Sequence, residues 1–289
     1  MKVLYHYCST NSFKAIVETH VVWLSSLSLS NDSMEGKLVA SVVSYLAERD
    51  GLDHVSTKQL QDMITPFEQI IEGLGFCLSE EGDLLSQWRG YAADATGVSI
   101  GFSREYIEWL AEESRDRDKD EAGFSLAKVK YEPEEHKEEV GPIYSKAKQL
   151  IEEGALKVPG LRCLLDLRTD EQIKQENKKV KTANSALIFT MLSLFPKLFL
   201  LKSPAFREEI EWRLLSYLVL SEEDTCFYRA LQDRLIPYRS FQLKQPERQP
   251  ITEVILGPKH LTPIWLVEHF LRQNGYGTVT VKRSEVTYR

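Results

Sequence analysis

The sequence has few cysteines, and none of them lies in a metal-binding or redox pair. Its 289 residues include 4 cysteines and 6 histidines. No two cysteines form a CxxC pair, which argues against a zinc ribbon or a thioredoxin-like site. No two histidines are four residues apart, so we expect no metal site on a helix. The patterns GxGxxG, GxxxxGK[ST], HExxH and GxSxG are also absent, which leaves no enzyme class that a short motif defines.

An excess of positive charge and a long hydrophobic run are missing as well. The net charge is −7, so the chain as a whole does not attract nucleic acid. The most apolar segment, residues 187–201, is too short to span a bilayer, and its Pro196 interrupts a helix. We therefore expect a buried, broken helix there and no membrane partner. The first residues lack an apolar leader, which favours a cytoplasmic location with free thiols.

The order of the expected elements favours an α+β fold. Strand-like segments occur at both ends of the sequence, whereas the middle is helical by composition. This order predicts one α+β domain over 1–289, with a mixed or antiparallel sheet and a helical insertion at 134–200. The expected strands are 3–7, 21–24, 75–79, 98–102, 128–131, 210–220, 239–243, 251–256 and 277–282. The expected helices are 13–19, 38–49, 58–72, 84–91, 103–113, 134–153, 171–195 and 262–274, and the charged run 115–121 and the connector 154–170 are expected to be loops.

His6 is the histidine with the clearest candidate role. It lies between Tyr5 and Tyr7 in the first expected strand, where alternation places Leu4 and His6 on one face and both tyrosines on the other. One interpretation is a core histidine that donates to a backbone carbonyl. The other is a neutral imidazole that hydrogen-bonds a ligand hydroxyl. The sequence leaves both open.

Trp88, Arg89 and Tyr91 crowd one short segment beside a glycine. Aromatic faces stack on planar rings, and a guanidinium matches the geometry of phosphate. The segment therefore suits a nucleotide. The alternative is a core tryptophan with Arg89 in a salt bridge.

Two glutamates precede an arginine at the start of a hydrophobic strand. In an extended chain Glu209, Glu211 and Arg213 project to one face, and Ile210 and Trp212 to the other. Carboxylates there are costly if buried, but not if they face a cleft. Arg213 would then keep a carboxylate ionised. The alternative is a solvated face of an edge strand.

Several segments are similar, in the same order, to a mainly bacterial family named domain of unknown function 2971. The resemblance covers most of the chain apart from the helical middle, and the family has no settled activity to imply. The matching segments are LYHYCS (4–9), WLSSLSLSNDSMEG (23–36), FCLSEEGDLLSQWRGYAADATGVSIGF (76–102), KVKY (128–131), FREEIEWRLL (206–215) and EVILGPK (253–259).

The opening segment, LYHYCSTNSFKAIVETHVVWLS, also resembles ADP-ribosyltransferase-like proteins. That resemblance implies their fold and NAD as the substrate, and the dispersed histidines already led us to expect no metal. In such proteins a histidine hydrogen-bonds a ribose hydroxyl, an aromatic ring stacks on the nicotinamide, and a glutamate stabilises the positive charge that builds up on the ribose. The residues implied here are Glu211 and Glu209 for catalysis, and His6, Tyr7, Trp88, Arg89, Tyr91 and Arg213 for binding NAD.

The resemblance thus implies a cytoplasmic NAD-consuming enzyme that transfers ADP-ribose to an unknown acceptor or hydrolyses NAD. Relatives of that type often act in toxin or phage-defence systems. A second hypothesis is a non-catalytic module that senses a nucleotide or binds a partner protein. Its signature would be Glu209 and Glu211 locked in ion pairs to Arg213 or Arg207. A third hypothesis is a nucleic-acid-processing enzyme.

Overall fold

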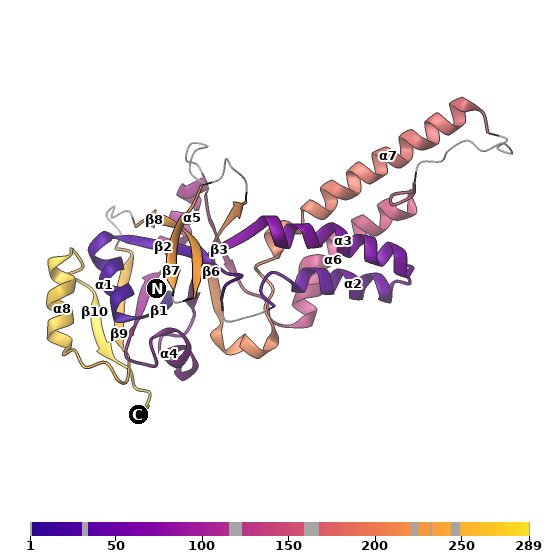
Figure 1. Ribbon diagram of the computed structural model, residues 1–289. Helices are drawn as coiled ribbons and strands as arrows, with labels where there is room; N and C mark the ends of the chain where they lie inside the picture. Colours follow the sequence, from indigo (N-terminus) through magenta and orange to yellow (C-terminus); the bar gives the residue numbers. More distant parts are fainter. Residues whose placement is uncertain are drawn as a thin grey trace. The chain divides into compact units, whose positions relative to one another are not determined.

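The structure is a computed structural model that describes residues 2–30, 34–115, 123–158, 168–220, 225–231, 233–243 and 249–288, without the side chains of 67–69 and 115. The chain forms two compact units. The sheet unit consists of residues 1–31, 72–129 and 205–289, and the helical unit of residues 32–71 and 130–204 (Figure 1). The helical unit thus includes residues before the expected insertion at 134–200. That the whole chain is one domain stays a prediction.

The described part of the sheet unit contains a ten-stranded mixed sheet. The strand order is β10-β9-β4-β1-β3-β2-β8-β7, and β6 pairs with both β3 and β5. The pairs β1–β3, β1–β4, β2–β3, β2–β8, β4–β9, β5–β6 and β7–β8 are antiparallel, and β9–β10 is parallel. The strands are β1 (Val3–Cys8), β2 (Val21–Ser26), β3 (Ile71–Ser79), β4 (Val98–Ser103), β5 (Ser125–Lys128), β6 (Glu211–Val219), β7 (Phe227–Leu231), β8 (Arg234–Gln242), β9 (Ile251–Leu256) and β10 (Thr280–Arg283).

The prediction of an α+β fold with a mixed sheet is confirmed. Helices α1 (Thr10–Thr19), α4 (Leu85–Tyr91), α5 (Arg104–Arg115) and α8 (Ile264–Gln273) belong to the same unit. In α1 the apolar residues at helical spacing are the buried ones, and Ser9 caps the helix by accepting from the backbone N–H of Ser12 at 3.1 Å. After α8, Gly275 adopts a left-handed φ of 85°, as a residue at the C′ position of a helix often does.

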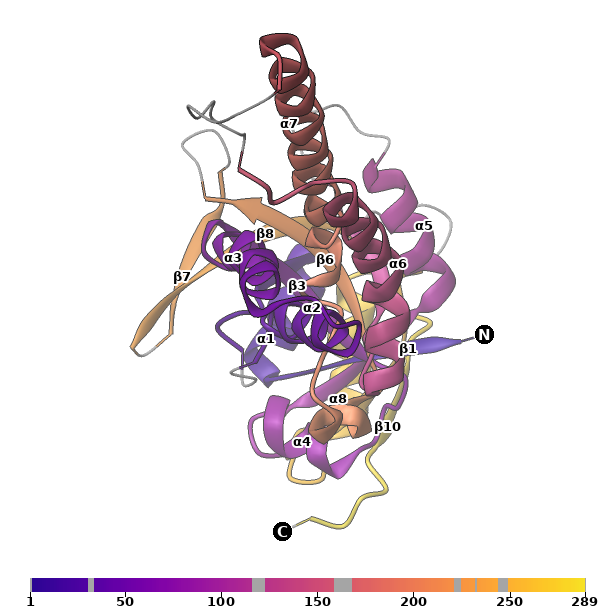
Figure 2. The same ribbon diagram turned by 90° about the vertical axis from the view of Figure 1, so that its right-hand side faces the viewer.

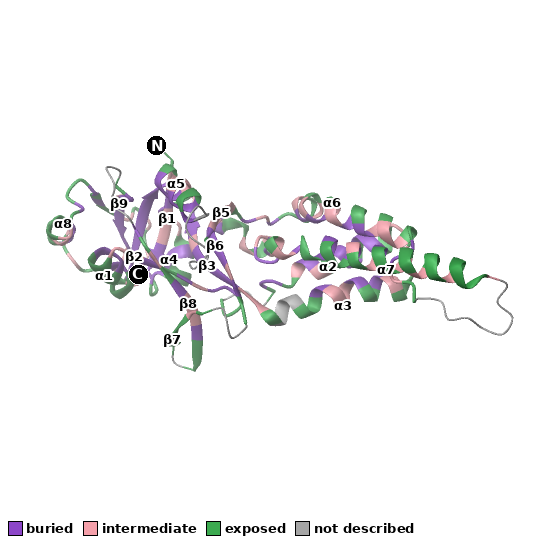
Figure 3. Cartoon of the chain, turned by 90° about the horizontal axis from the view of Figure 1, so that it is seen from above, coloured by how far each residue is buried: buried purple, intermediate pink, exposed green. Residues whose placement is uncertain are grey.

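The helical unit contains α2 (Leu38–Arg49), α3 (His54–Ile70), α6 (Pro133–Glu152) and α7 (Asp170–Leu192). Residues 170–182 of α7 include no buried side chain, as the green colour of this segment in Figure 3 shows. The second half of α7 is amphipathic, because Leu187 and Met191 are buried while Phe189 is 72% exposed. The prediction of a fully buried helix is therefore wrong in that respect. The interruption near Pro196 is confirmed, since α7 ends at Leu192 and a short 3₁₀ helix covers Phe195–Lys197.

Three further expectations differ from the structure. The strand expected at 128–131 lies earlier, as β5, and Lys130 instead forms an isolated bridge with Leu201. Helix α3 ends before residue 71, where β3 begins. Strand β7 was not predicted at all. Residues 116–121 of the expected charged loop and residues 159–167 of the expected connector lie outside the described residues. Within the described residues no helix is long and apolar enough to cross a membrane.

Candidate site at β1, α4 and β6

The candidate residues all lie in the sheet unit, on or just before three of its elements. His6 and Tyr7 are on β1, whereas Trp88, Arg89 and Tyr91 are on α4. Strand β3 pairs with both β1 and β6 and so connects the histidine strand to the glutamate strand. The structure therefore brings together segments that are far apart in the sequence.

His6 is held by the neighbouring strand β3. Its Nδ1 lies 2.8 Å from the carbonyl oxygen of Cys77, which can only accept, so Nδ1 carries the proton. The ring stacks on Phe76 with 4.0 Å between centroids. Burial disfavours the charged imidazolium and lowers the pKa of His6 to about 4, although the bond to Cys77 acts in the opposite direction. The ring is thus neutral at pH 7, and Nε2 keeps a lone pair that can accept a hydrogen bond.

Tyr7 positions the start of α4. Its hydroxyl donates to the carbonyl of Glu81 at 2.9 Å and accepts from the backbone N–H of Leu84 at 2.9 Å. Burial raises the pKa of this phenol, which therefore stays protonated. The ring meets the edge of Trp88, with 4.9 Å between centroids. These contacts give Tyr7 a structural role, while NAD binding by Tyr7 stays a prediction.

Trp88 is enclosed by the protein, with 0% of its surface exposed. Its indole N–H donates to Asp83 at 2.6 Å. The second oxygen of Asp83 accepts from the backbone N–H of Glu285 at 2.7 Å, and Ser284 also donates to this carboxylate. Asp83 therefore connects the start of α4 to the C-terminal segment. No motif in the sequence indicated this role of Asp83.

Of the three candidate residues on α4, Arg89 and Tyr91 are exposed. The guanidinium carbon of Arg89 lies 5.9 Å from the ring centroid of Tyr288. Tyr91 is 38% exposed, and its hydroxyl donates to Oε1 of Glu209 at 2.7 Å. Of the two aromatic residues expected to stack on a ligand, Tyr91 is thus the one that a ligand can reach.

Glu209 and Glu211 do not lie in one continuous strand. Glu209 ends a 3₁₀ helix over Pro204–Glu209, and Ile210 has a φ of 43°. This left-handed residue costs energy for a β-branched side chain and turns the chain before β6 begins. The expected alternation through Glu209 is therefore wrong, because it assumed an extended backbone.

Glu211 and Arg213 form a buried ion pair. Nε of Arg213 donates to Oε1 of Glu211 at 2.8 Å, and Nη2 donates to Oε2 at 2.9 Å. The side chains are 1% and 6% exposed for Arg213 and Glu211. The prediction that both project to one face is confirmed. The alternative interpretation, in which these residues lie on the solvated face of an edge strand, is wrong because β6 lies between β3 and β5.

The backbone between α4 and β4 is unusual. Ala93, Asp94 and Ala95 have φ values of 49°, 51° and 68°, a left-handed conformation that costs roughly 1 kcal/mol or more per residue without glycine. A Cβ atom at Gly97 would lie 2.2 Å from the carbonyl oxygen of Cys8. The loop therefore passes directly against the end of β1, and only glycine fits there.

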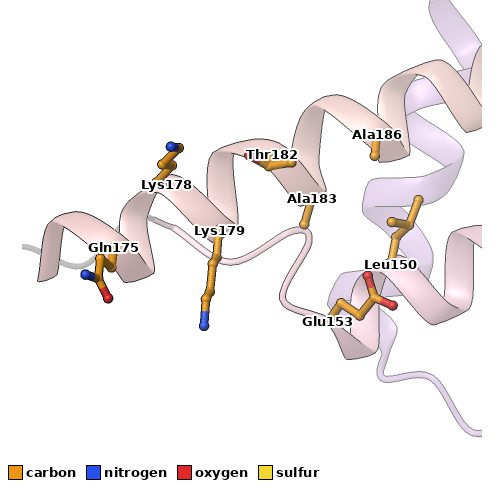
Figure 4. A pocket seen from close by; sticks show the side chains of 8 residues that line it. All are labelled: Leu150, Glu153, Gln175, Lys178, Lys179, Thr182, Ala183 and Ala186. Carbon is orange, nitrogen blue, oxygen red and sulfur yellow. The ribbon is translucent and has the colours of Figure 1, made fainter. Parts of the chain in front are cut away.

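A groove of about 560 Å³ lies in the helical unit, between α6 and α7 (Figure 4). Leu150, Ala183 and Ala186 supply its apolar part, and Lys178 and Lys179 are among its polar residues. None of the predicted site residues lines it. No cluster of three or more His, Cys, Asp or Glu residues suited to a metal ion occurs in the part of the chain that the structure describes.

Comparison with known proteins gives one family. Residues 87–214 match the family described as protein of unknown function (DUF2971). No curated protein and no solved structure matches the chain. The matched segment begins within α4 and ends within β6, so it includes Trp88, Tyr91 and the Glu211–Arg213 pair. The resemblance to this family that the sequence indicated is thus confirmed over residues 87–214.

Proposed function

We propose that this chain binds a nucleotide at the β1–α4–β6 site without cleaving it. The observation that carries the proposal is the pairing of Glu211 with Arg213. A carboxylate that stabilises charge on a ribose must face the substrate, whereas both oxygens of Glu211 accept from Arg213 in the interior. Separating the two would leave an uncompensated buried charge, which costs about 3–5 kcal/mol.

Two side chains on α4 support a nucleotide as the ligand. His6 is not one of them, because alternation along β1 places its ring beside Phe76, on the face opposite to Tyr7, against which Trp88 of α4 packs. Arg89 is exposed and carries the fork of donors that binds phosphate. Tyr91 offers an exposed aromatic ring for stacking on a base. None of these contacts requires a free carboxylate.

One contact favours NAD cleavage as a second candidate function. The hydroxyl of Tyr91 donates to Glu209 at 2.7 Å, so an exposed aromatic residue and a carboxylate lie together. If NAD is cleaved, we expect Glu209 rather than Glu211 to act on the ribose. ADP-ribose would then pass to water or to an unknown acceptor.

The test combines titration calorimetry with a chromatographic assay for free nicotinamide. We expect NAD and ADP-ribose to bind, and we expect nicotinamide to stay at the level of the buffer control. Replacing Arg89 or Tyr91 with alanine should weaken binding by about tenfold or more, because each change removes a contact worth about 1.4 kcal/mol. Glu208→Gln is the matched control, since Glu208 is exposed and adjacent to Glu209.

Each outcome separates the candidates. Nicotinamide release that is lost in Glu209→Gln but kept in Glu208→Gln would establish the second candidate. Release that depends on Glu211 would overturn the argument from the ion pair. If neither NAD nor ADP-ribose binds at concentrations up to about 1 mM, a weak affinity of about −4 kcal/mol, the nucleotide proposal fails.

A further inference from the structure

Strand β7 is the last strand on one side of the sheet. It pairs with β8 through five residue pairs, from Phe227–Tyr238 to Leu231–Arg234. No second partner strand of β7 occurs in the described residues. Its outer backbone N–H and C=O groups therefore form an open edge, as Figure 2 shows for the β7–β8 hairpin.

This edge is apolar and exposed on both faces. Phe227 is 61% exposed, Tyr228 60% and Leu231 49%. On one face, Phe227 continues an aromatic row, because its ring lies 5.7 Å from that of Tyr238, which stacks on Trp23 at 4.4 Å. Proteins protect open edges with charges, proline or short covering segments, because such edges pair with other chains. Here β7 keeps large apolar side chains on both faces.

Arg229 lies in the middle of β7 and carries a side-chain donor, Nε, for which the described residues supply no acceptor. Its Nε is enclosed, yet it has no hydrogen-bond partner among the described residues. An enclosed donor without an acceptor costs about 1–3 kcal/mol. Because side chains alternate along a strand, Arg229 shares its face with Phe227 and Leu231. A cation whose Nε lacks an acceptor thus lies between two exposed apolar side chains.

We propose that the outer edge of β7 binds an extended acidic segment of a partner protein as an additional strand. Backbone hydrogen bonds to the open edge supply part of the affinity, and alternate side chains supply the selectivity. A carboxylate opposite Arg229 pairs with the positive charge of its guanidinium. Apolar residues two positions before and after that carboxylate lie opposite Phe227 and Leu231.

The charge of Arg229 argues against a second copy of this chain as the occupant. A two-fold antiparallel pairing of β7 with itself about its middle residue sets Arg229 opposite Arg229, and like charges directly opposite each other destabilise a sheet. The net charge of −7 is spread over 289 residues. Charges farther away than about 8 Å are largely screened at physiological salt, and Arg229 is the one charged residue within β7 itself.

The test uses two labelled peptides with the full chain, followed by fluorescence anisotropy. The probes are Thr-Val-Thr-Asp-Thr-Val-Thr and the same peptide with lysine at the centre. We expect the aspartate peptide to bind about tenfold tighter or more. In Arg229→Glu the order should reverse, so that the lysine peptide binds tighter. Arg234→Glu is the matched control, because Arg234 already pairs with Asp233 at 3.0 Å, and it should leave the order unchanged.

Three results would overturn the proposal. They are equal affinity for both peptides, a preference that Arg229→Glu leaves unchanged, and undiminished binding of an aspartate peptide whose alternate backbone amides are methylated. A fourth result that would overturn it is the failure of both peptides to bind at about 1 mM. If Arg229→Glu does not fold, the relative affinities of the two peptides for the native chain still test the proposal. A dimer in light scattering that Phe227→Ser dissolves would assign the edge to a second copy instead.

Discussion

Arg213 donates two hydrogen bonds to Glu211, from Nε at 2.8 Å and from Nη2 at 2.9 Å, and both side chains are buried in β6. The two residues are separated by one position, so a single strand carries both members of the pair. This relationship decides how the glutamate can be used. An exposed Glu211 could face a substrate, whereas a buried Glu211 is held in place by Arg213.

The first prediction concerns this pair. Arg213→Met removes the opposite charge and the two hydrogen bonds that Arg213 supplies to the buried Glu211 carboxylate, and we expect a loss of about 3–5 kcal/mol in the free energy of unfolding. The double variant Glu211→Leu with Arg213→Met removes both charges and should lose less than Arg213→Met alone. Urea denaturation measures both. Arg234→Met, at an exposed pair, is the control and should stay within about 0.5 kcal/mol.

The lowered pKa of His6 predicts that the free energy of unfolding depends on pH. An imidazole titrates near 6.5 in an unfolded chain, whereas burial lowers the pKa of His6 to about 4 in the fold. Below pH 6.5 the unfolded chain therefore takes up a proton that the folded chain excludes. The contribution of His6 is complete above pH 6.5 and is lost as the pH falls toward 4, by at most about 1.4 kcal/mol per pH unit.

The measurement is the difference between the unfolding free energies of the native chain and His6→Asn from pH 7 to 4. Asparagine keeps a donor toward Cys77 but does not titrate. The native chain should lose more stability than the variant over this range. The exposed His54 provides the control variant His54→Asn, which should follow the native curve. Parallel curves for native and His6→Asn would contradict the prediction.

Asp83 gives the third prediction. Its carboxylate accepts from the indole of Trp88, the hydroxyl of Ser284 and the backbone of Glu285. Asp83→Ala leaves the buried indole N–H without an acceptor, which costs about 1–3 kcal/mol. Hydrogen exchange should then be faster at the amide of Glu285, because its acceptor is gone. Unchanged exchange there would show that other contacts hold the C-terminal segment.

Two glycines of the same region are expected to respond in opposite ways. Alanine at Gly97 places its Cβ 2.2 Å from the backbone oxygen of Cys8, so the chain must shift. We expect a loss of about 1–3 kcal/mol, as for other overpacked positions. At Gly90, in α4, an added Cβ would meet no atom within 4 Å. There, alanine should stabilise the helix by about 0.5–1 kcal/mol. Thermal unfolding of both variants tests the contrast.

The regular elements could be predicted where burial follows a clear period. The expected helix at 38–49 matches α2 from Leu38 to Arg49, because its apolar residues recur at helical spacing. Strand β7 escaped prediction for the opposite reason. Four of its five residues are exposed, so its sequence, FYRAL, shows no alternation between buried and exposed positions. Pairing with β8 makes it a strand, and a local pattern does not contain that information.

The candidate site could be predicted only in part. Residue types indicated His6, Tyr91 and Glu211, but their contacts depend on other segments. The acceptor for His6 comes from β3, and the acceptor for Trp88 comes from the Asp83 turn. The left-handed φ of Ile210 separates Glu209 from β6. A propensity argument assigns an extended conformation to isoleucine and therefore misses this turn.

The division of the chain into units also sets an order of folding during synthesis. The helical unit is complete once residue 204 has been made, whereas the sheet unit still lacks residues 205–289. Until then β3 lacks its partner strand β6, β2 lacks β8, and β4 lacks β9. Contacts between segments so far apart in sequence form slowly, and unpaired strands favour aggregation. We therefore expect the nascent chain to need protection at these three strands until its last third leaves the ribosome.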